Sequence, residues 1–197
     1  MRAYLAPLAN VKIIGNALAS QRGSLSELMR NLEAKFRLSD LSIARQRARI
    51  IGFDPRGALN QRDTFFVAAR GKLKLRDQAG EAWLIHYQRG GEEELQVSDY
   101  TIVAVTDPEA LRKMLADALG ILAEVRKHRM LMIRRNIRLH LDRVEGLGDF
   151  GELEAVLADN DMPEAFHEEL ATILGDLGVA TADLIDRSYF ELIRSST

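Results

Sequence analysis

The chain has 197 residues, 47% of them hydrophobic and 28% charged, and its formal net charge is −2. These values fit one globular domain and do not favour non-specific nucleic-acid binding. The sequence has no cysteine, which excludes disulfides, zinc–thiolate sites and cysteine nucleophiles and is compatible with a reducing cytoplasm. Because no apolar run approaches the roughly 20 residues of a membrane-spanning helix, we expect a cytoplasmic protein that binds neither membrane nor nucleic acid.

Residues 1–28 differ from the rest of the chain, because three basic residues precede the first acidic one. A targeting segment is one interpretation, although Asn10 and Lys12 interrupt its apolar stretch. We expect instead an N-terminal extension outside the domain. Met29 lies just before the first strand pattern and would make a natural start for a domain that spans 29–197.

The elements follow from the spacing of apolar residues. Alternation indicates a first strand at 31–38, after which Ser39 or Asp40 begins a helix that runs to Ile51. Pro108, at a position that helices tolerate, begins a second helix at 108–118. Further strand patterns lie at 59–68, 71–77, 81–89, 95–105, 121–133, 136–145 and 149–158, and amphipathic helices at 162–175 and 181–193 close the chain.

Eight strands with short connections favour an antiparallel arrangement, because parallel strands need a crossover between each pair. The pattern allows an antiparallel barrel or a sandwich. We expect a mainly β (α+β) fold, an eight-stranded antiparallel barrel with peripheral amphipathic helices.

One face of the strands collects charge. The side chains that share it are Glu33, Lys35 and Arg37; Lys72, Lys74 and Arg76; Tyr87 and Arg89; Lys127 and Arg129; Arg138, His140 and Asp142; and Glu152 and Glu154. These faces are compatible with the solvated side of an ordinary sheet. The amphipathic helices need an apolar surface, however, and the opposite strand faces provide one, which favours a barrel with its charges inside. Interior charges are costly unless paired or ligand-bound, so a basic lumen predicts an anionic ligand, and its carboxylates predict a hard cation such as Mg²⁺.

Two other signals carry less weight. Gly146, Gly148 and Gly151 spell G-x-G-x-x-G, but no βαβ unit surrounds them, so a hairpin turn explains them better than a dinucleotide site. The basic stretch at 126–138 has the charge of a nucleic-acid site, but alternation divides it over two faces and no aromatic stacking surface accompanies it.

Short segments of the chain resemble, in order and spacing, the CYTH superfamily of triphosphate tunnel metalloenzymes. That group includes class IV adenylyl cyclases, thiamine triphosphatases and inorganic triphosphatases. The similar segments lie at 30–35, 71–76, 87–89, 98–100, 125–129, 138–144, 148–154 and 183–193. The resemblance therefore covers some 160 residues, from Arg30 to Ile193.

The resemblance implies roles for the charged residues. Phosphate contacts would come from Lys35, Arg37, Lys72, Lys74, Arg76, Tyr87, Arg89, Lys127, Arg129, Arg138 and His140. A Mg²⁺ or Mn²⁺ ion would be held by Glu33, Asp142, Glu152 and Glu154. Lys35 and Glu154 would also act in catalysis. The family pattern Glu-x-Glu-x-Lys falls on Asn31, Glu33 and Lys35, so one carboxylate of the pattern is missing and a second metal is in doubt.

Three functions stay open at this stage. The resemblance implies a metal-dependent triphosphatase acting on tripolyphosphate, a nucleoside triphosphate or thiamine triphosphate, or a class IV adenylyl cyclase that converts ATP to cyclic AMP. A non-catalytic polyphosphate- or nucleotide-binding module is the third. We expect the triphosphatase, with a small-molecule triphosphate as its partner. The oligomeric state stays open, and a homodimer is compatible with the sequence.

Overall fold

The computed structural model describes residues 29–89, 95–158 and 160–195, so the expected extension at 1–28 lies outside the described residues. Within these ranges no helix is both long and apolar enough to span a membrane. The strands are β1 (Met29–Arg37), β2 (Asp54–Phe66), β3 (Lys72–Gln78), β4 (Glu81–Arg89), β5 (Gln96–Val105), β6 (Ile121–Arg134), β7 (Ile137–Val144), β8 (Gly148–Leu157) and β9 (Leu184–Ile185). The helices are α1 (Leu41–Ile50), α2 (Pro108–Leu119), α3 (Glu164–Leu177) and α4 (Tyr189–Ser195), with a 3₁₀ turn at Thr181–Asp183.

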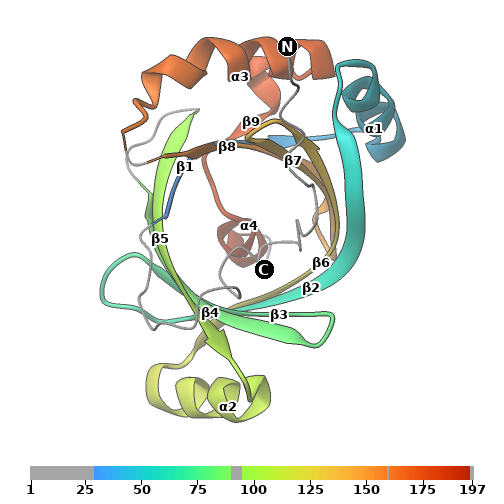
Figure 1. Ribbon diagram of the computed structural model, residues 1–197. Coiled ribbons are helices and arrows are strands. Elements are labelled where there is room, and N and C mark those ends of the chain that lie inside the picture. The colour runs from blue at the N-terminus through green and yellow to red at the C-terminus, as the bar shows by residue number, and fades with distance from the viewer. Residues whose placement is uncertain (1–28, 90–94, 159, 196–197) are drawn as a thin grey trace, which may run out of the picture.

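Eight strands form a closed antiparallel barrel, which confirms the predicted fold class. The strand order is β5-β4-β3-β2-β6-β7-β8-β1, and β5 pairs with β1 to close the ring. The closing register runs from Met29 opposite Tyr100 to Glu33 opposite Gln96. Figure 1 shows the barrel along its axis, with α1 and α3 against one side of the wall and α2 outside the opposite side.

The main apolar core lies outside the barrel wall. Outward side chains such as Phe36, Leu139 and Leu153 are fully buried beneath α1 and α3 and belong to one hydrophobic cluster with residues of both helices. Asp40 caps α1 by accepting a hydrogen bond from the backbone amide of Ser42, as predicted from the sequence. Because the apolar faces of these strands are turned outward under helices, the charged faces are turned inward.

The predicted helix at 181–193 is wrong in its first half. The pairing of β5 with β1 ends at Glu33, and the two-residue strand β9 pairs with the next part of β1, Ile185 opposite Lys35 and Leu184 opposite Phe36. Leu184 and Ile185 thus belong to a helical sequence pattern but are extended, because they pair with a strand that is distant in sequence. Helix α4 begins only at Tyr189.

Helix α4 lies within the ring of strands in the view of Figure 1. The Phe190 ring stacks on Phe65 of β2 with ring centroids 4.7 Å apart, and Tyr189 packs edge-on against Phe150 at 5.1 Å. These contacts belong to a second hydrophobic cluster that includes Val125 of β6. We conclude that α4 fills part of the lumen.

Strand β2 begins five residues earlier than the predicted start at 59. Its first residues pair with the end of β6, with a register shift between Pro55 and Gly57. Proline and glycine disfavour a regular strand, which is why alternation alone missed this part. The irregularity lets the ladder pass the proline.

Candidate active site in the barrel lumen

Inward side chains from all eight barrel strands line one cavity. Its basic side chains are Lys35, Lys74, Arg76, Lys127, Arg129 and Arg138, and its acidic ones are Glu33, Asp63, Glu152 and Glu154. These residues come from β1, β2, β3, β6, β7 and β8, and their spacing by two along each strand is what directs them to one side. Tyr87 also lines the cavity.

Five of the predicted site residues lie elsewhere or lack a described side chain. Arg37 is exposed, with its guanidinium 5.3 Å from the centre of the Phe150 ring. Lys72 is half-buried beside α4. His140 and Asp142 are completely buried next to the cavity-lining carboxylates and arginine. The side chain of Arg89 lies outside the described part of the chain.

Lys72 is held by α4. Its ammonium group donates to the Glu191 carboxylate at 3.0 Å and lies 3.4 Å from the Ser188 hydroxyl. Glu191 also accepts a 2.7 Å hydrogen bond from the backbone amide of Ser188. Burial raises the pKa of Glu191, but the hydrogen bonds from Ser188 outweigh it and the net pKa lies below the usual value. This ion pair fixes the start of α4 against β3.

A chain of ion pairs runs along the inner wall over the four neighbouring strands β1, β8, β7 and β6. Lys35 pairs with Glu152, which also accepts from Arg129. Arg129 binds Asp142 through two hydrogen bonds of 2.7 and 2.6 Å, and the Tyr189 hydroxyl donates to Asp142 at 2.9 Å. Burial raises the pKa of Asp142, but the Arg129 charge more than offsets this, so the net pKa is lowered. Both Asp142 oxygens thus have partners, and in this arrangement Asp142 orients Arg129 and Tyr189.

Asp63 is a site residue that the sequence interpretation missed. It is almost completely buried, and it accepts two 2.7 Å hydrogen bonds from Arg76. The ammonium groups of Lys74 and Lys127 lie 3.3 and 3.9 Å from the same carboxylate. The signal was present, because Asp63 and Phe65 alternate with Arg62 and Thr64 as in the other strands. Asp63 is the counter-charge that allows three cations to share one region of the lumen.

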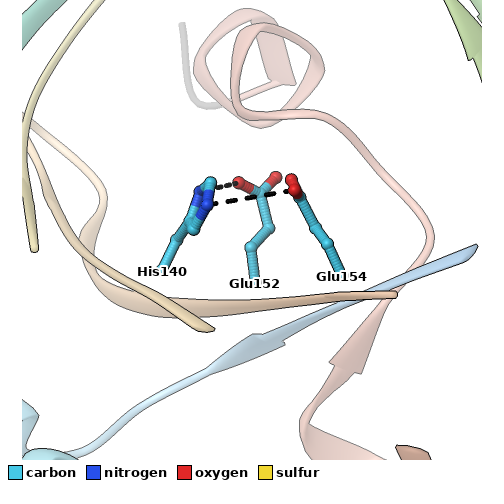
Figure 2. A group of neighbouring side chains, drawn as sticks. All are labelled: His140, Glu152 and Glu154. Carbon is cyan, nitrogen blue, oxygen red and sulfur yellow. Dashed lines mark ion pairs between the residues drawn. The ribbon is translucent and has the colours of Figure 1, made fainter. Parts of the chain in front are cut away.

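His140, Glu152 and Glu154 form a compact cluster on β7 and β8, shown in Figure 2. The His140 Nδ1 atom lies 3.9 Å from Glu152, and Nε2 lies 3.9 Å from Glu154. Neither ring nitrogen has a hydrogen-bond partner in the described ranges. Burial, together with Arg129, holds the pKa of His140 well below its usual value, so the imidazole is neutral.

This cluster fits a divalent cation. One ligand atom from each of the three residues lies within 4.8 Å of the other two. Carboxylates suit Mg²⁺ and Mn²⁺, and neutral imidazole is a common ligand of transition metals. Arg138 lies 3.1 Å from Glu154, so Lys35, Arg129 and Arg138 neutralise the two carboxylates in this state. The unpartnered imidazole is the observation that points to a ligand.

The fold and the site together are those of a closed antiparallel barrel with a charged lumen and three side chains that could hold a metal ion. Residues 29–189 match the CYTH domain, so this chain belongs to the CYTH family. Members of the family are metal-dependent adenylyl cyclases and triphosphatases. The resemblance inferred from the sequence is thereby confirmed.

Individual proteins are similar to this chain in sequence or in fold. A Methanocaldococcus jannaschii protein named "Putative adenylate cyclase" is 29% identical over 122 residues, which cover 61% of this chain and 69% of that protein. A structure from Pyrococcus horikoshii has a TM-score of 0.72 at 23% identity, over 82% of this chain and 98% of the other. A structure from Hippeastrum, described as a "Putative adenylyl cyclase" with a dominant triphosphatase activity, has a TM-score of 0.61 at 18% identity, over 85% and 96% of the two chains.

Proposed function

We propose that the protein is a divalent-metal-dependent triphosphatase that holds the triphosphate of its substrate in the barrel lumen. One observation carries the proposal: six basic side chains line the same cavity as Glu152 and Glu154. His140 lies beside them, and its ring nitrogens have no hydrogen-bond partner among the described residues. Lysine and arginine bind phosphate oxygens, and His140 with the two glutamates can hold Mg²⁺ or Mn²⁺. The ligand is therefore an anion that binds together with a metal ion.

In the proposed mechanism, substrate binding exchanges ion-pair partners. In the structure, Glu152 and Glu154 are neutralised by Lys35, Arg129 and Arg138. The phosphate oxygens of a substrate would attract these cations, and the two carboxylates would then be free to bind a divalent cation with His140. That cation supplies charge neutralisation at the phosphoryl group.

The catalytic roles are proposed for Lys35 and Glu154. The Lys35 ammonium group is buried 4.1 Å above the Tyr189 ring, so it is held at one place in the lumen where it can contact the transferred phosphoryl group. Glu154 lines the cavity, and among the described residues Arg138 lies 3.1 Å and His140 3.9 Å from its carboxylate. It is the carboxylate best placed to orient an attacking water molecule.

Adenylyl cyclase activity is the second candidate. The name of the Methanocaldococcus jannaschii relative favours it, whereas the triphosphatase activity described for the Hippeastrum protein favours hydrolysis. Cyclisation also requires the ribose 3′-hydroxyl to be held in line with the α-phosphate. Positioning a water molecule is the smaller demand on the site, so we place hydrolysis first.

The test incubates the protein with tripolyphosphate, ATP and thiamine triphosphate, each with Mg²⁺, Mn²⁺ or EDTA. We expect phosphate release that requires the metal. Triphosphate binding in calorimetry without turnover of any substrate would instead identify a non-catalytic binding module.

A further inference from the structure

Helix α1 leaves two large apolar side chains uncovered. Ile43 is 49% exposed and Ile50 is 76% exposed, the highest value for a large apolar side chain among the described residues. They are seven residues apart, which is about two helical turns, so they lie on one face of α1. Arg47 shares this face, and its guanidinium group donates a 2.7 Å hydrogen bond to the Leu177 carbonyl at the end of α3. The exposed isoleucines therefore lie along the side of α1 that is turned toward α3.

The two neighbouring helices carry opposite charge. Helix α1 contains three arginines and no acidic residue. Helix α3 contains four acidic residues and neither lysine nor arginine. The side chains of Arg49 on α1 and of Glu164, Glu168 and Asp176 on α3 are exposed, and both helices lie outside the barrel wall in Figure 1. An apolar strip thus lies between a basic helix surface and an acidic one.

The charges of α1 and α3 do not neutralise each other. Within the described ranges no salt bridge joins the two helices, and the salt bridges of Glu169 go to Arg134 and Arg135, at the end of β6 and in the turn after it. Arg49 and Glu168 have no salt-bridge partner among the described residues. Both signs of charge are therefore available to a molecule that docks on this face.

A face with this arrangement is complementary to itself. In a two-fold dimer each contact is made twice, and an axis along the groove between the helices places α1 of one protomer over α3 of its partner. The basic surface of each protomer then meets the acidic surface of the other, and the isoleucines of both lie at the centre. An apolar centre with a charged rim is the usual anatomy of a protein interface.

We propose that the outer face of α1 and α3 binds a second copy of this chain, so that the protein is a homodimer in solution. Charge complementarity selects this occupant. An acidic partner would fit α1 but be repelled by α3, and a basic partner would fit α3 but be repelled by α1. A second copy presents both signs in the matching order. Because the two helices lie outside the wall and the candidate active site lies inside it, the inference is independent of the proposed function.

The test measures the mass of the full chain by analytical ultracentrifugation and light scattering over a range of concentrations. We expect a dimer at about 50 μM, with a dissociation constant of about 10 μM or lower. Ile50→Asp should raise this Kd at least about 10-fold, because it places a charge in the apolar centre. Met114→Asp is the matched control, since Met114 is 58% exposed on α2, outside the opposite side of the wall. Its Kd should stay within about 2-fold of the wild-type value.

Two charge reversals test whether α1 of one protomer meets α3 of the other. Arg49→Glu and Glu168→Arg should each raise the Kd about 5- to 20-fold, because like charges then meet at both contacts of the dimer. An equimolar mixture of the two variants should recover the dimer, since each contact then unites opposite charges. No other pairing of the helices predicts this recovery.

A monomeric wild type, a dimer that Ile50→Asp leaves unchanged, or a mixture of the charge variants that stays monomeric would overturn the inference. So would a chain shortened to begin at Met29 that dimerises while the full chain does not, because residues 1–28 would then be the occupant of this face. Circular dichroism melting identifies any variant that fails to fold. Ile43→Asp, on the same face of α1, replaces Ile50→Asp in that case.

Discussion

Glu152 and Glu154 lie on the same strand, but they differ in the number of basic side chains that they neutralise. Glu152 neutralises both Lys35 and Arg129, which are themselves buried, whereas the salt bridge to Glu154 comes from Arg138. Burial raises the pKa of Glu152, but the charges of Lys35 and Arg129 hold it well below its usual value. The carboxylate is therefore charged, and removing it leaves two buried cations short of a partner.

We predict that Glu154→Gln lowers metal-dependent turnover at least about 100-fold with little change in melting temperature. Glu152→Gln should lose activity as well, and it should also lower the free energy of unfolding by about 3 kcal/mol. Turnover assays beside circular dichroism melting test both. Full activity in both variants would disprove the proposed metal site.

Lys74 gives the lumen a pH-dependent charge. Burial and the neighbouring Arg76 lower its pKa to about 8. Burial and Arg129 lower the pKa of Lys127 to about 7, so Lys127 is already largely neutral at pH 8. A charged lysine attracts phosphate, so triphosphate affinity should fall further above pH 8, where Lys74 loses its charge. We predict a KM that increases above pH 8 by up to about tenfold per pH unit, and Lys74→Arg, which stays charged, should remove most of this increase. KM measured from pH 6.5 to 9.5 decides it, and a parallel rise in the arginine variant would contradict the assignment to Lys74.

The residues of the lumen show what alternation in a sequence can and cannot predict. It identified most inward positions of β1, β3, β6, β7 and β8, because a period of two fixes the face of a strand whatever its neighbours are. It also placed Arg37 on that face, but the Arg37 side chain is exposed. It could not predict that Asp142 would bind Arg129 and Tyr189, since these partners come from distant segments. Asp63 was within reach of the same reasoning.

At the scale of elements, the approach of β1 to β8 depends on Gly151. A Cβ atom at this position would lie 2.1 Å from the Phe36 ring, which is completely buried between the wall and the outer helices. Gly175 in α3 offers a contrast, because a Cβ atom there would meet nothing within 4 Å. Position 151 therefore has no room for a Cβ atom, whereas position 175 has, although both glycines belong to regular elements.

We predict that Gly151→Ala destabilises the protein by about 3 kcal/mol or more, because a buried aromatic ring must move. Gly175→Ala should stabilise it by about 0.5–1 kcal/mol, since alanine favours a helix interior. Chemical denaturation measures both. Equal stability of the Gly151→Ala variant and the wild type would mean that Phe36 packs elsewhere.

The C-terminal segment shows where a local sequence pattern fails to predict the secondary structure. The apolar residues at 181–193 do have helical spacing. Leu184 and Ile185 nevertheless form a strand, because they pair with the β1 backbone at Phe36 and Lys35. Such a pairing depends on where β5 begins, about 90 residues earlier in the chain. The barrel strands were predictable because their patterns are long, whereas β9 has two residues.

For the molecule as a whole, the barrel closes with residues from Met29 onward. Met29 itself pairs with Tyr100, and the family match also begins at this residue. We predict that a chain shortened to begin at Met29 folds with the same melting temperature and keeps its activity. Circular dichroism melting and turnover of the shortened and full chains test this. Insolubility or inactivity of the shortened chain would show that residues 1–28 are a structural part of the domain.

The last prediction concerns the reaction that the whole lumen performs on ATP. Six basic side chains from four strands line the lumen. In the proposed function they would hold a triphosphate, and hydrolysis would then need only a positioned water molecule. Cyclisation needs the ribose 3′-hydroxyl in line with the α-phosphate, so both ends of the substrate must be fixed. We predict that ADP and phosphate exceed cyclic AMP and pyrophosphate with either Mg²⁺ or Mn²⁺, as separated by chromatography. Cyclic AMP and pyrophosphate as main products would reverse the order of the two proposed activities.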